Sequence, residues 1–267
     1  PVGQCALEYF DLHDHIVSID LTPNRGDCLS YQGVAREIAM AFEYPFTPVQ
    51  QAKEIDAKTL DLSQDPLVED ACLDYALAQL DAIDAKKSLP QNITRLLRRS
   101  GIRPVSSLVD ITQYVMLQTG QPLHAFDKDK ITLPLSVRYA KDNESMVLID
   151  DTVAKLDPSV LVIVDQNGPV AIAGVMGSKA SAVDENTSSM ILEAGHFTQE
   201  VIAQKAQKYK LNSDAAYRFS RGVGREKVVP ALKMAIDLLG VHTGAQLQGW
   251  DYKTIGKADA LKTLSFA

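Results

Sequence analysis

The runs Val160–Val164 and Val170–Ile172, joined by Asn167-Gly168, restrict the fold of this chain more than any other feature. Two short, mostly β-branched runs on either side of an Asn-Gly pair predict an antiparallel hairpin, because that pair accepts the backbone angles of a tight turn. The chain is therefore expected to contain an antiparallel sheet, and its other elements decide what packs on that sheet.

The other predicted elements mix strands with helices in no strict order. Strands are expected near residues 16–21, 73–80, 135–139, 145–149 and 190–193. Helices are expected over 30–42 with Ser30 as the N-cap, over 88–100 before Gly101, over 198–209, and over 226–239 ending at Gly240. Mixing without alternation favours an α+β fold with mixed or antiparallel sheets and packed helices over a doubly wound parallel sheet.

The chain divides most readily between residues 46 and 71. This segment holds Pro48 and Pro66, mixed polarity and an excess of acidic residues, and is interpreted as a linker. Residues 1–45 precede it and a larger domain, 72–245, follows it, before a last segment, 246–267. Because the chain starts at Pro1 in what reads as mid-domain sequence, it is expected to be a piece of a longer protein.

Charge and composition limit the classes of function. The formal net charge of −7 argues against a generally basic nucleic-acid-binding surface. Basic residues nevertheless cluster over 91–109 and 205–227, which suits either limited contact with RNA or solvated helix faces. Three scattered cysteines suit a reducing cytoplasm, and no apolar run has the length of a membrane span.

The usual catalytic signatures are absent from the sequence. It contains no Gly-x-x-x-x-Gly-Lys phosphate loop, no Gly-x-Ser-x-Gly elbow and no His-Glu-x-x-His zinc helix. His13-Asp14-His15 has the residue types of a metal site, but in a polar segment it is more simply a surface feature. No metal is therefore expected.

Four short segments place polar residues among apolar or glycine-rich neighbours. They are Gly101-Ile-Arg-Pro104, Gly120-Gln-Pro-Leu-His-Ala-Phe-Asp127, Ala173-Gly-Val-Met-Gly177 and Ile191-Leu-Glu193. Each has an ordinary structural reading: His124 as a core histidine, Glu193 as a strand-edge carboxylate, and Arg103 as an ion-pair donor. Glycines such as Gly174 and Gly177 would let the backbone approach a ligand closely.

In this order the segments resemble the beta chain of bacterial phenylalanyl-tRNA synthetases. Further matching stretches are Asp20-Leu-Thr-Pro-Asn-Arg-Gly-Asp-Cys-Leu-Ser30, Gly33-Val-Ala-Arg-Glu37, Val109-Asp-Ile-Thr-Gln-Tyr-Val-Met116 and the run over 211–223. The resemblance implies that residues 72–245 are the tRNA-editing domain, which hydrolyses the ester of tyrosyl-tRNA(Phe). It also implies that 1–45 end one structural domain and that 246–267 begin another.

Carried over position by position, the family's editing residues fall on seven positions: Arg103, Thr112, His124, Gly177, Glu193, Ser213 and Ala215. Gln113 and Gly174 are further candidates for binding the substrate. The chain departs from the family pattern at Gln113, where Asn is typical, and at Ser213, where Thr is common. The change at Gln113 bears on the geometry of the pocket.

The resemblance assigns these residues two kinds of role. His124, Gly177 and Thr112 are catalytic candidates, with His124 holding a water molecule or the terminal ribose and Gly177 admitting a close approach. Glu193 would read the tyrosine hydroxyl, because a hydrophobic pocket rejects an added hydroxyl only weakly and a second site must recognise it. The other candidates bind substrate. Arg103 would contact phosphate or ribose. Ser213 and Ala215 would line one wall of the pocket.

The resemblance also implies partners for a whole enzyme. They are tRNA(Phe) and an alpha chain, in a heterotetramer of two alpha and two beta chains that uses ATP and magnesium. This piece should hold no cofactor and no aminoacylation site. Two alternatives stay open: a non-catalytic structural or RNA-contacting module of the same synthetase, and a domain that is active only within the whole enzyme.

Overall fold

The computed structural model describes residues 2–10, 12–48 and 57–255. The α-helices are α1 (Ala6–Tyr9), α2 (Tyr31–Ala41), α3 (Gln91–Arg99), α4 (Ser107–Thr119), α5 (Gln199–Lys208), α6 (Asp214–Phe219) and α7 (Val228–Thr243). The strands are β1 (Cys72–Asp81), β2 (His124–Asp127), β3 (Ser136–Tyr139), β4 (Ser145–Val147), β5 (Val153–Lys155), β6 (Leu161–Val164), β7 (Pro169–Ile172), β8 (Met176–Gly177), β9 (Met190–Phe197) and β10 (Gln246–Thr254). Short 3-10 turns are η1 (Gly26–Cys28), η2 (Lys128–Lys130), η3 (Lys179–Ser181) and η4 (Arg225–Lys227).

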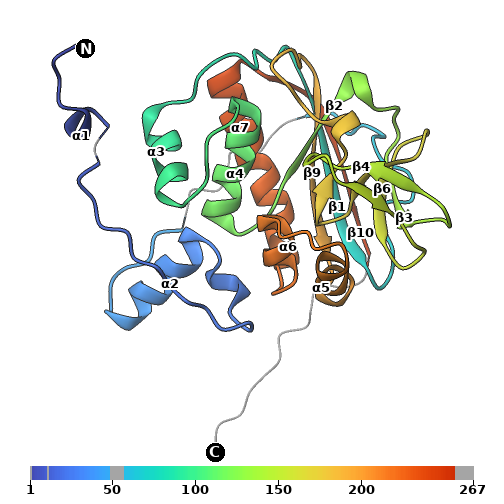
Figure 1. Cartoon of the computed structure of the whole chain (residues 1–267), viewed down its shortest axis with the longest axis horizontal. Coiled ribbons are helices and arrows are strands. Elements are labelled where there is room, and N and C mark those ends of the chain that lie inside the picture. Colours follow the sequence, from blue (N-terminus) through green and yellow to red (C-terminus); the bar gives the residue numbers. More distant parts are fainter. Residues whose placement is uncertain (1, 11, 49–56, 256–267) are drawn as a thin grey trace, which may run out of the picture.

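Two four-stranded sheets form the body of the domain. The first has the order β10-β1-β9-β2 and the second the order β3-β6-β7-β8, with every pairing antiparallel. Helices α4 and α7 lie on one side of the first sheet, and the second sheet lies on its other side (Figure 1). The predicted α+β fold with antiparallel sheets and packed helices is confirmed.

The alternation of side chains along β1 explains this layering. Tyr75 and Leu77 point to one face, where they share a core with the apolar strands β6 and β7. Ala76 and Ala78 point to the other face, where they share a core with α4 and α7. Small alanines on that face let the helices pack close to the sheet, while the larger residues fill the space between the two sheets.

Most local predictions are confirmed. The predicted hairpin is β6–β7, with Val162 opposite Ile172 and Ile163 opposite Ala171. Helix α2 begins after Ser30, whose Oγ accepts a hydrogen bond from the Gly33 N–H at 3.0 Å.

The strand predicted near residues 16–21 is wrong. These residues have no regular structure, and Ile16 and Ile19 are exposed. Among the described residues no strand pairs with this segment, and a β-branched run without a partner gains no ladder hydrogen bonds. The end predicted for the last helix is also wrong, because α7 passes through Gly240 and ends at Gly244, whose φ is +81°.

The last predicted boundary, at residue 245, needs correction. Residues 246–254 form β10, which pairs with β1 from Asp81 to Asp74 and so belongs to the first sheet. Part of the predicted linker also joins this body: Leu62 is buried in the core, and Thr59 bridges to Trp250. Residues 49–56 and 256–267 lie outside the described residues, and the assignment of 1–45 to a preceding domain stays a prediction.

No helix among the described residues combines the length and the apolar character that crossing a membrane requires.

Candidate functional site

His124 and Glu193 face each other where β2 pairs with β9. The two residues are direct cross-strand partners at the start of β2. The His124 ring packs edge-on against Phe126, with ring centroids 4.5 Å apart. Strand pairing therefore brings an imidazole and a carboxyl group, far apart in the sequence, to one place on the face that meets the second sheet.

Gly177 lies against the His124 ring. A Cβ atom at Gly177 would lie 2.4 Å from His124 Cε1 and 2.6 Å from Nε2, which is closer than real Cβ contacts. Gly174, with φ +66°, approaches the rings of Phe197 and Phe219 in the same way. Both glycines allow the β7–β8 turn to close over these side chains.

A narrow cavity of about 60 Å³ lies between these elements. Its lining residues are Pro122, Leu123, His124, Ile163, Ala171, Ile172, Gly174, Val175, Met176, Gly177, Glu193, Phe197, Ala215 and Phe219. His124 and Glu193 are the titratable groups in this otherwise apolar lining. A few precisely placed polar groups in an apolar cavity are typical of a small-ligand site.

Both polar side chains present atoms without a partner. His124 Nε2 and Glu193 Oε1 are buried and have no hydrogen-bond partner among the described residues. Burial lowers the pKa of His124 to about 4 and raises the pKa of Glu193 to about 8. At pH 7 the site therefore holds a neutral imidazole and a protonated carboxyl group, which offers both a donor and an acceptor.

Comparison with known proteins shows which family this chain belongs to. The family model of the B3/4 domain matches residues 71–244. This chain belongs to the B3/4 domain family. The match begins one residue before β1 and ends at the glycine that caps α7, so it contains all the cavity residues.

Curated relatives of this B3/4 chain carry the name that the resemblance suggested. The phenylalanine–tRNA ligase beta subunit of Francisella tularensis is 41% identical over 251 residues, which cover 92% of this chain and 31% of the relative. That of Haemophilus influenzae strain 86-028NP is 42% identical over 243 residues, covering 90% of this chain and 30% of the relative. The B3/4 chain thus spans about a third of the length of these relatives.

One solved structure is also similar to the B3/4 chain. It is an N-terminal fragment of the phenylalanyl-tRNA synthetase beta-subunit from Pyrococcus horikoshii, with 15% sequence identity and a TM-score of 0.49. The similarity covers 84% of this chain and 60% of that one.

Five predicted site residues of the B3/4 domain line the cavity together. They are His124, Gly174, Gly177, Glu193 and Ala215. Ser213 lies beside it: its Oγ donates a hydrogen bond to the Val175 carbonyl at 2.6 Å and accepts one from the Ala216 N–H at 3.0 Å. Ser213 thus ties the start of α6, and with it Ala215, to the β7–β8 turn.

Three predicted site residues do not line the cavity. Thr112 and Gln113 lie on α4, whose apolar residues pack on the opposite face of the first sheet, and Thr112 Oγ1 donates to the Val109 carbonyl at 2.7 Å. Gln113, where the family pattern has Asn, keeps a buried Oε1 without a partner among the described residues. Arg103 is exposed between α3 and α4. Contact of these three with a ligand stays a prediction.

Gln121 is a buried contributor that the predictions omitted. Its Nε2 donates to the carbonyls of Pro122 at 2.9 Å and Gly195 at 3.0 Å, which fixes the segment before His124 to β9. Gln121 belongs to Gly120–Asp127, one of the four segments that place polar residues among apolar neighbours, and this position could have identified it as a contributor. Phe197 and Phe219, whose rings meet edge-on at 5.3 Å, form a further part of the wall.

The burial of this pair predicts a pH dependence of stability. Glu193 keeps its proton in the folded chain up to pH about 8, whereas an unfolded glutamate loses it near 4.5, so stability should fall as pH rises through this range. His124 acts oppositely between about 4 and 6.5, because only the unfolded chain binds its proton there. Below pH 6.5 the effects of Glu193 and His124 on stability oppose each other. Above pH 6.5 only the effect of Glu193 remains, and we expect the free energy of unfolding to fall by up to about 1.4 kcal/mol per pH unit.

Chemical denaturation between pH 6 and 8.5 measures this slope. The matched variant is Glu193→Gln, which has similar shape and no titration, so its free energy of unfolding should lack the decline. Parallel pH profiles for the two proteins would show that Glu193 does not hold its proton in the folded chain.

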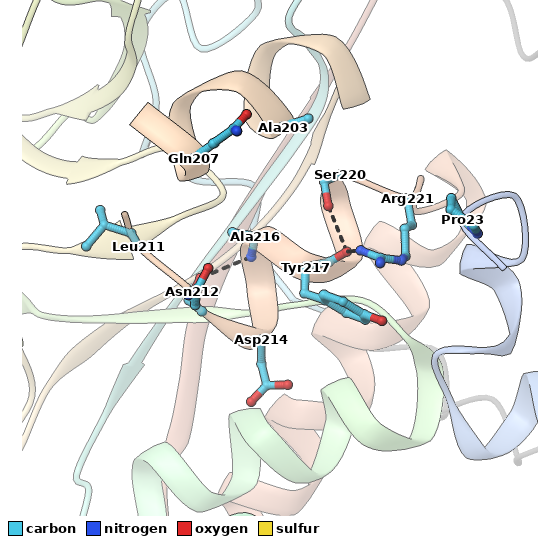
Figure 2. A pocket seen from close by; sticks show the side chains of 11 residues that line it. Pro23, Ala203, Gln207, Leu211, Asn212, Asp214, Ala216, Tyr217, Ser220 and Arg221 are labelled. Carbon is cyan, nitrogen blue, oxygen red and sulfur yellow. Dashed lines mark hydrogen bonds between the residues drawn. The ribbon is translucent and has the colours of Figure 1, made fainter. Parts of the chain in front are cut away.

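A second hollow adjoins the cavity on the other side of α6. It is an open groove of about 780 Å³, and Tyr217, Ser220 and Arg221 project along it (Figure 2). Ser213 contributes to its lining, whereas Ala215 lines the cavity. Helix α6 thus forms a wall shared by the two hollows.

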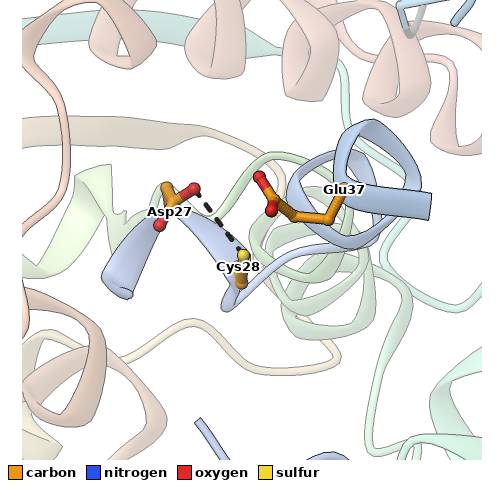
Figure 3. A group of neighbouring side chains, drawn as sticks. All are labelled: Asp27, Cys28 and Glu37. Atoms are coloured by element: carbon orange, nitrogen blue, oxygen red, sulfur yellow. Dashed lines mark hydrogen bonds between the residues drawn. The ribbon is translucent and has the colours of Figure 1, made fainter. Parts of the chain in front are cut away.

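One group of possible metal ligands exists among the described residues: Asp27, Cys28 and Glu37 (Figure 3). Arg25 occupies the position that a cation would take. It pairs with Asp27 at 3.0 Å and with Glu37 at 2.8 Å, and it donates to Cys28 Sγ at 2.9 Å. Burial also raises the pKa of the Cys28 thiol, which disfavours the thiolate that binds metals. The group is an ion-pair cluster around Arg25.

Proposed function

We propose that this chain is the editing module of a phenylalanine–tRNA ligase beta subunit and hydrolyses the ester of tyrosyl-tRNA(Phe). The observation that carries the proposal is the neutral, unpaired carboxyl group of Glu193 opposite His124 in an apolar cavity. Names of the relatives support the synthetase context, and membership of the B3/4 family supports the location of the site.

Glu193 fits recognition of a phenol hydroxyl. A protonated carboxyl group can accept a hydrogen bond from the hydroxyl and donate one to it. A phenylalanine ring would leave these buried polar atoms unpaired, at a cost of about 1–3 kcal/mol. This site therefore favours tyrosine over phenylalanine, whereas an apolar pocket that binds phenylalanine only weakly rejects the added hydroxyl of tyrosine.

His124 fits a role at the ester. In the reaction, water attacks the ester carbonyl carbon, the bond to the ribose oxygen breaks, and that oxygen leaves with a proton as free tyrosine is released. A neutral imidazole at pH 7 can hold the water or the ribose hydroxyl through Nε2, the nitrogen that lacks a partner. Gly177 lets the backbone of β8 lie directly against the ring, where a side chain would displace the imidazole.

The whole-enzyme context is part of the same proposal. The complete protein would pair with an alpha chain in a heterotetramer of two alpha and two beta chains, act in the cytoplasm, and use ATP and magnesium for ligation at a site outside this chain. Within the described residues, Asp27, Cys28 and Glu37 are the possible metal ligands, and Arg25 already pairs with them.

Deacylation of tyrosyl-tRNA(Phe) by the full synthetase tests the proposal. Glu193→Ala should lower kcat/KM for tyrosyl-tRNA(Phe) by about 10- to 100-fold, as loss of a buried hydrogen-bond partner does. Glu193→Gln, which keeps a donor and an acceptor, should retain more activity, and phenylalanyl-tRNA(Phe) is the control substrate.

Two outcomes would change the conclusion. If the wild-type synthetase does not hydrolyse tyrosyl-tRNA(Phe), the chain is the non-catalytic structural or RNA-contacting module. If the full synthetase is active and the isolated chain is silent, the domain needs the rest of the enzyme to receive tRNA.

A further inference from the structure

The groove beside the cavity contains an aromatic–cationic pair that the proposed reaction does not use. The Arg221 guanidinium carbon lies 3.6 Å from the centroid of the Tyr217 ring, so the two groups stack (Figure 2). Tyr217 is 44% exposed, which leaves ring surface open to the groove. Together they form a flat platform at the edge of α6, which we call the Tyr217–Arg221 platform.

The positive charge of the platform is not neutralised. Arg221 forms no ion pair with an acidic side chain among the described residues. Its Nη1 donates to the Tyr217 carbonyl at 3.4 Å, and its buried Nε has no hydrogen-bond partner in the described part of the chain. Asp214, the acidic residue of the groove lining, is paired with Arg218 at 3.0 Å. The guanidinium is therefore available to an anion that enters the groove.

The backbone holds the platform in place. Gly26 of η1 lies so close to it that a Cβ atom there would be 2.5 Å from the Arg221 carbonyl oxygen. The Arg218 guanidinium reaches back to the Leu29 carbonyl at 3.2 Å. The N-terminal segment thus braces the end of α6, and a braced stacking surface loses little conformational freedom when it binds a ligand.

Stacking surface, unpaired cation and neutral polar neighbours are the features that recognise single-stranded RNA. Bases stack on aromatic rings and on guanidinium planes, and a guanidinium also binds phosphate. Gln207 and Asn212 supply neutral hydrogen-bonding groups in the same groove. A protein or peptide partner would leave the cation without an anion, unless that partner were acidic.

We propose that the Tyr217–Arg221 platform binds a nucleotide of the RNA strand adjacent to the terminal adenosine whose ester enters the cavity. The base stacks on the exposed part of the Tyr217 ring, and the Arg221 N–H groups bind a backbone phosphate. This inference rests on the proposed function, which places the terminal adenosine at the cavity. Helix α6 contributes Ala215 and Phe219 to the cavity and Tyr217 to the groove, so the platform lies one helix away from the proposed site of the ester.

Comparison of two ester substrates tests the platform in the full synthetase. Tyr217→Ala and Arg221→Ala should each lower kcat/KM for tyrosyl-tRNA(Phe) about tenfold, mainly through KM, because a stacked base contributes on that scale. Both should leave hydrolysis of 3′-O-tyrosyl-adenosine unchanged, since that substrate has no adjacent nucleotide. Glu193→Ala should impair both substrates.

Conservative variants separate stacking from structure. Tyr217→Phe should behave as wild type, whereas Arg221→Lys should be impaired because it loses the planar stack. Lys86→Ala, which removes an exposed cation elsewhere, controls for net charge. Equal losses on both substrates in the platform variants would make their role structural, and no loss on either would overturn the inference.

A binding measurement keeps the inference independent of catalysis. The full synthetase should bind the RNA trinucleotide CCA more weakly when Tyr217 is replaced by Ala, against the constant background of its other sites. Weaker binding together with no hydrolysis by wild type would sustain the platform and refute the proposed reaction. Unchanged trinucleotide binding would refute the platform whatever the activity.

Discussion

Gly177→Ala should reduce hydrolysis of tyrosyl-tRNA(Phe) by the full synthetase about 100-fold. The new Cβ atom would lie 2.4 Å from His124 Cε1, so the imidazole must move. Phe126 packs against that ring on one side and β9 pairs beside it, so these neighbours favour movement of the ring into the cavity that it lines. A displacement of about 1 Å at a reacting group costs on the order of 100-fold in rate.

The control for this variant is the same chemical change at Gly240. There a Cβ atom would lie 3.5 Å from its nearest neighbour, the Ala245 carbonyl oxygen, inside helix α7. Gly240→Ala should leave deacylation unchanged and stabilise the chain by up to about 1 kcal/mol. If Gly177→Ala deacylates as fast as wild type, the position of His124 does not matter to the reaction.

Arg225→Ala should lower the free energy of unfolding by about 3–5 kcal/mol, because it leaves a buried carboxylate without its cation. Arg225 pairs with Asp74, whose side chain is 3% exposed. Its Nη2 also donates to the Ile255 carbonyl at 2.7 Å and to Thr254 Oγ1 at 3.0 Å. Arg225 therefore joins the start of β1 to the end of β10.

The pH dependence of this pair is opposite in sign to that of Glu193. Burial alone would raise the pKa of Asp74, but hydrogen bonds from Arg225 and Tyr252 hold it below its ordinary value of 3.8. The stabilisation is thus present above pH 3.8 and is lost as pH falls through the lowered pKa.

Chemical denaturation at pH 7 measures the effect of Arg225→Ala. Lys179→Ala is the matched control, because it removes one exposed partner of a surface pair with Asp151 and should cost less than about 1 kcal/mol. Similar, small losses in both variants would show that β10 is not tied to the domain by this contact. A loss confined to Arg225→Ala would support the inclusion of 246–254 in the domain.

Local signals predicted many of the elements. The hairpin β6–β7 and the Ser30 cap depend on residues within a few positions of each other, and both are confirmed. No prediction covers α4, although Ser106 caps its start and Gly120, with φ +82°, ends it. Its β-branched residues, such as Val109 and Ile111, obscured a helix that tertiary packing stabilises.

The sequence by itself determined which residues are unusual. Glu193 in an apolar strand, His124 among apolar neighbours and the glycines at 174 and 177 were evident without coordinates, and the structure brings them to one cavity. The tertiary structure decided which of these residues lie next to each other. Pairing of β2 with β9 sets Glu193 against His124, whereas Thr112, Gln113 and Arg103 lie elsewhere.

The physical reason is the range of the interactions involved. Caps, turns and side-chain periodicity depend on neighbours in the sequence, so a single chain displays them directly. Strand register and the dielectric around a buried group depend on distant segments that meet only after folding. The proton that Glu193 keeps up to pH about 8, and the membership of β10 in the first sheet, are therefore properties of the folded chain alone.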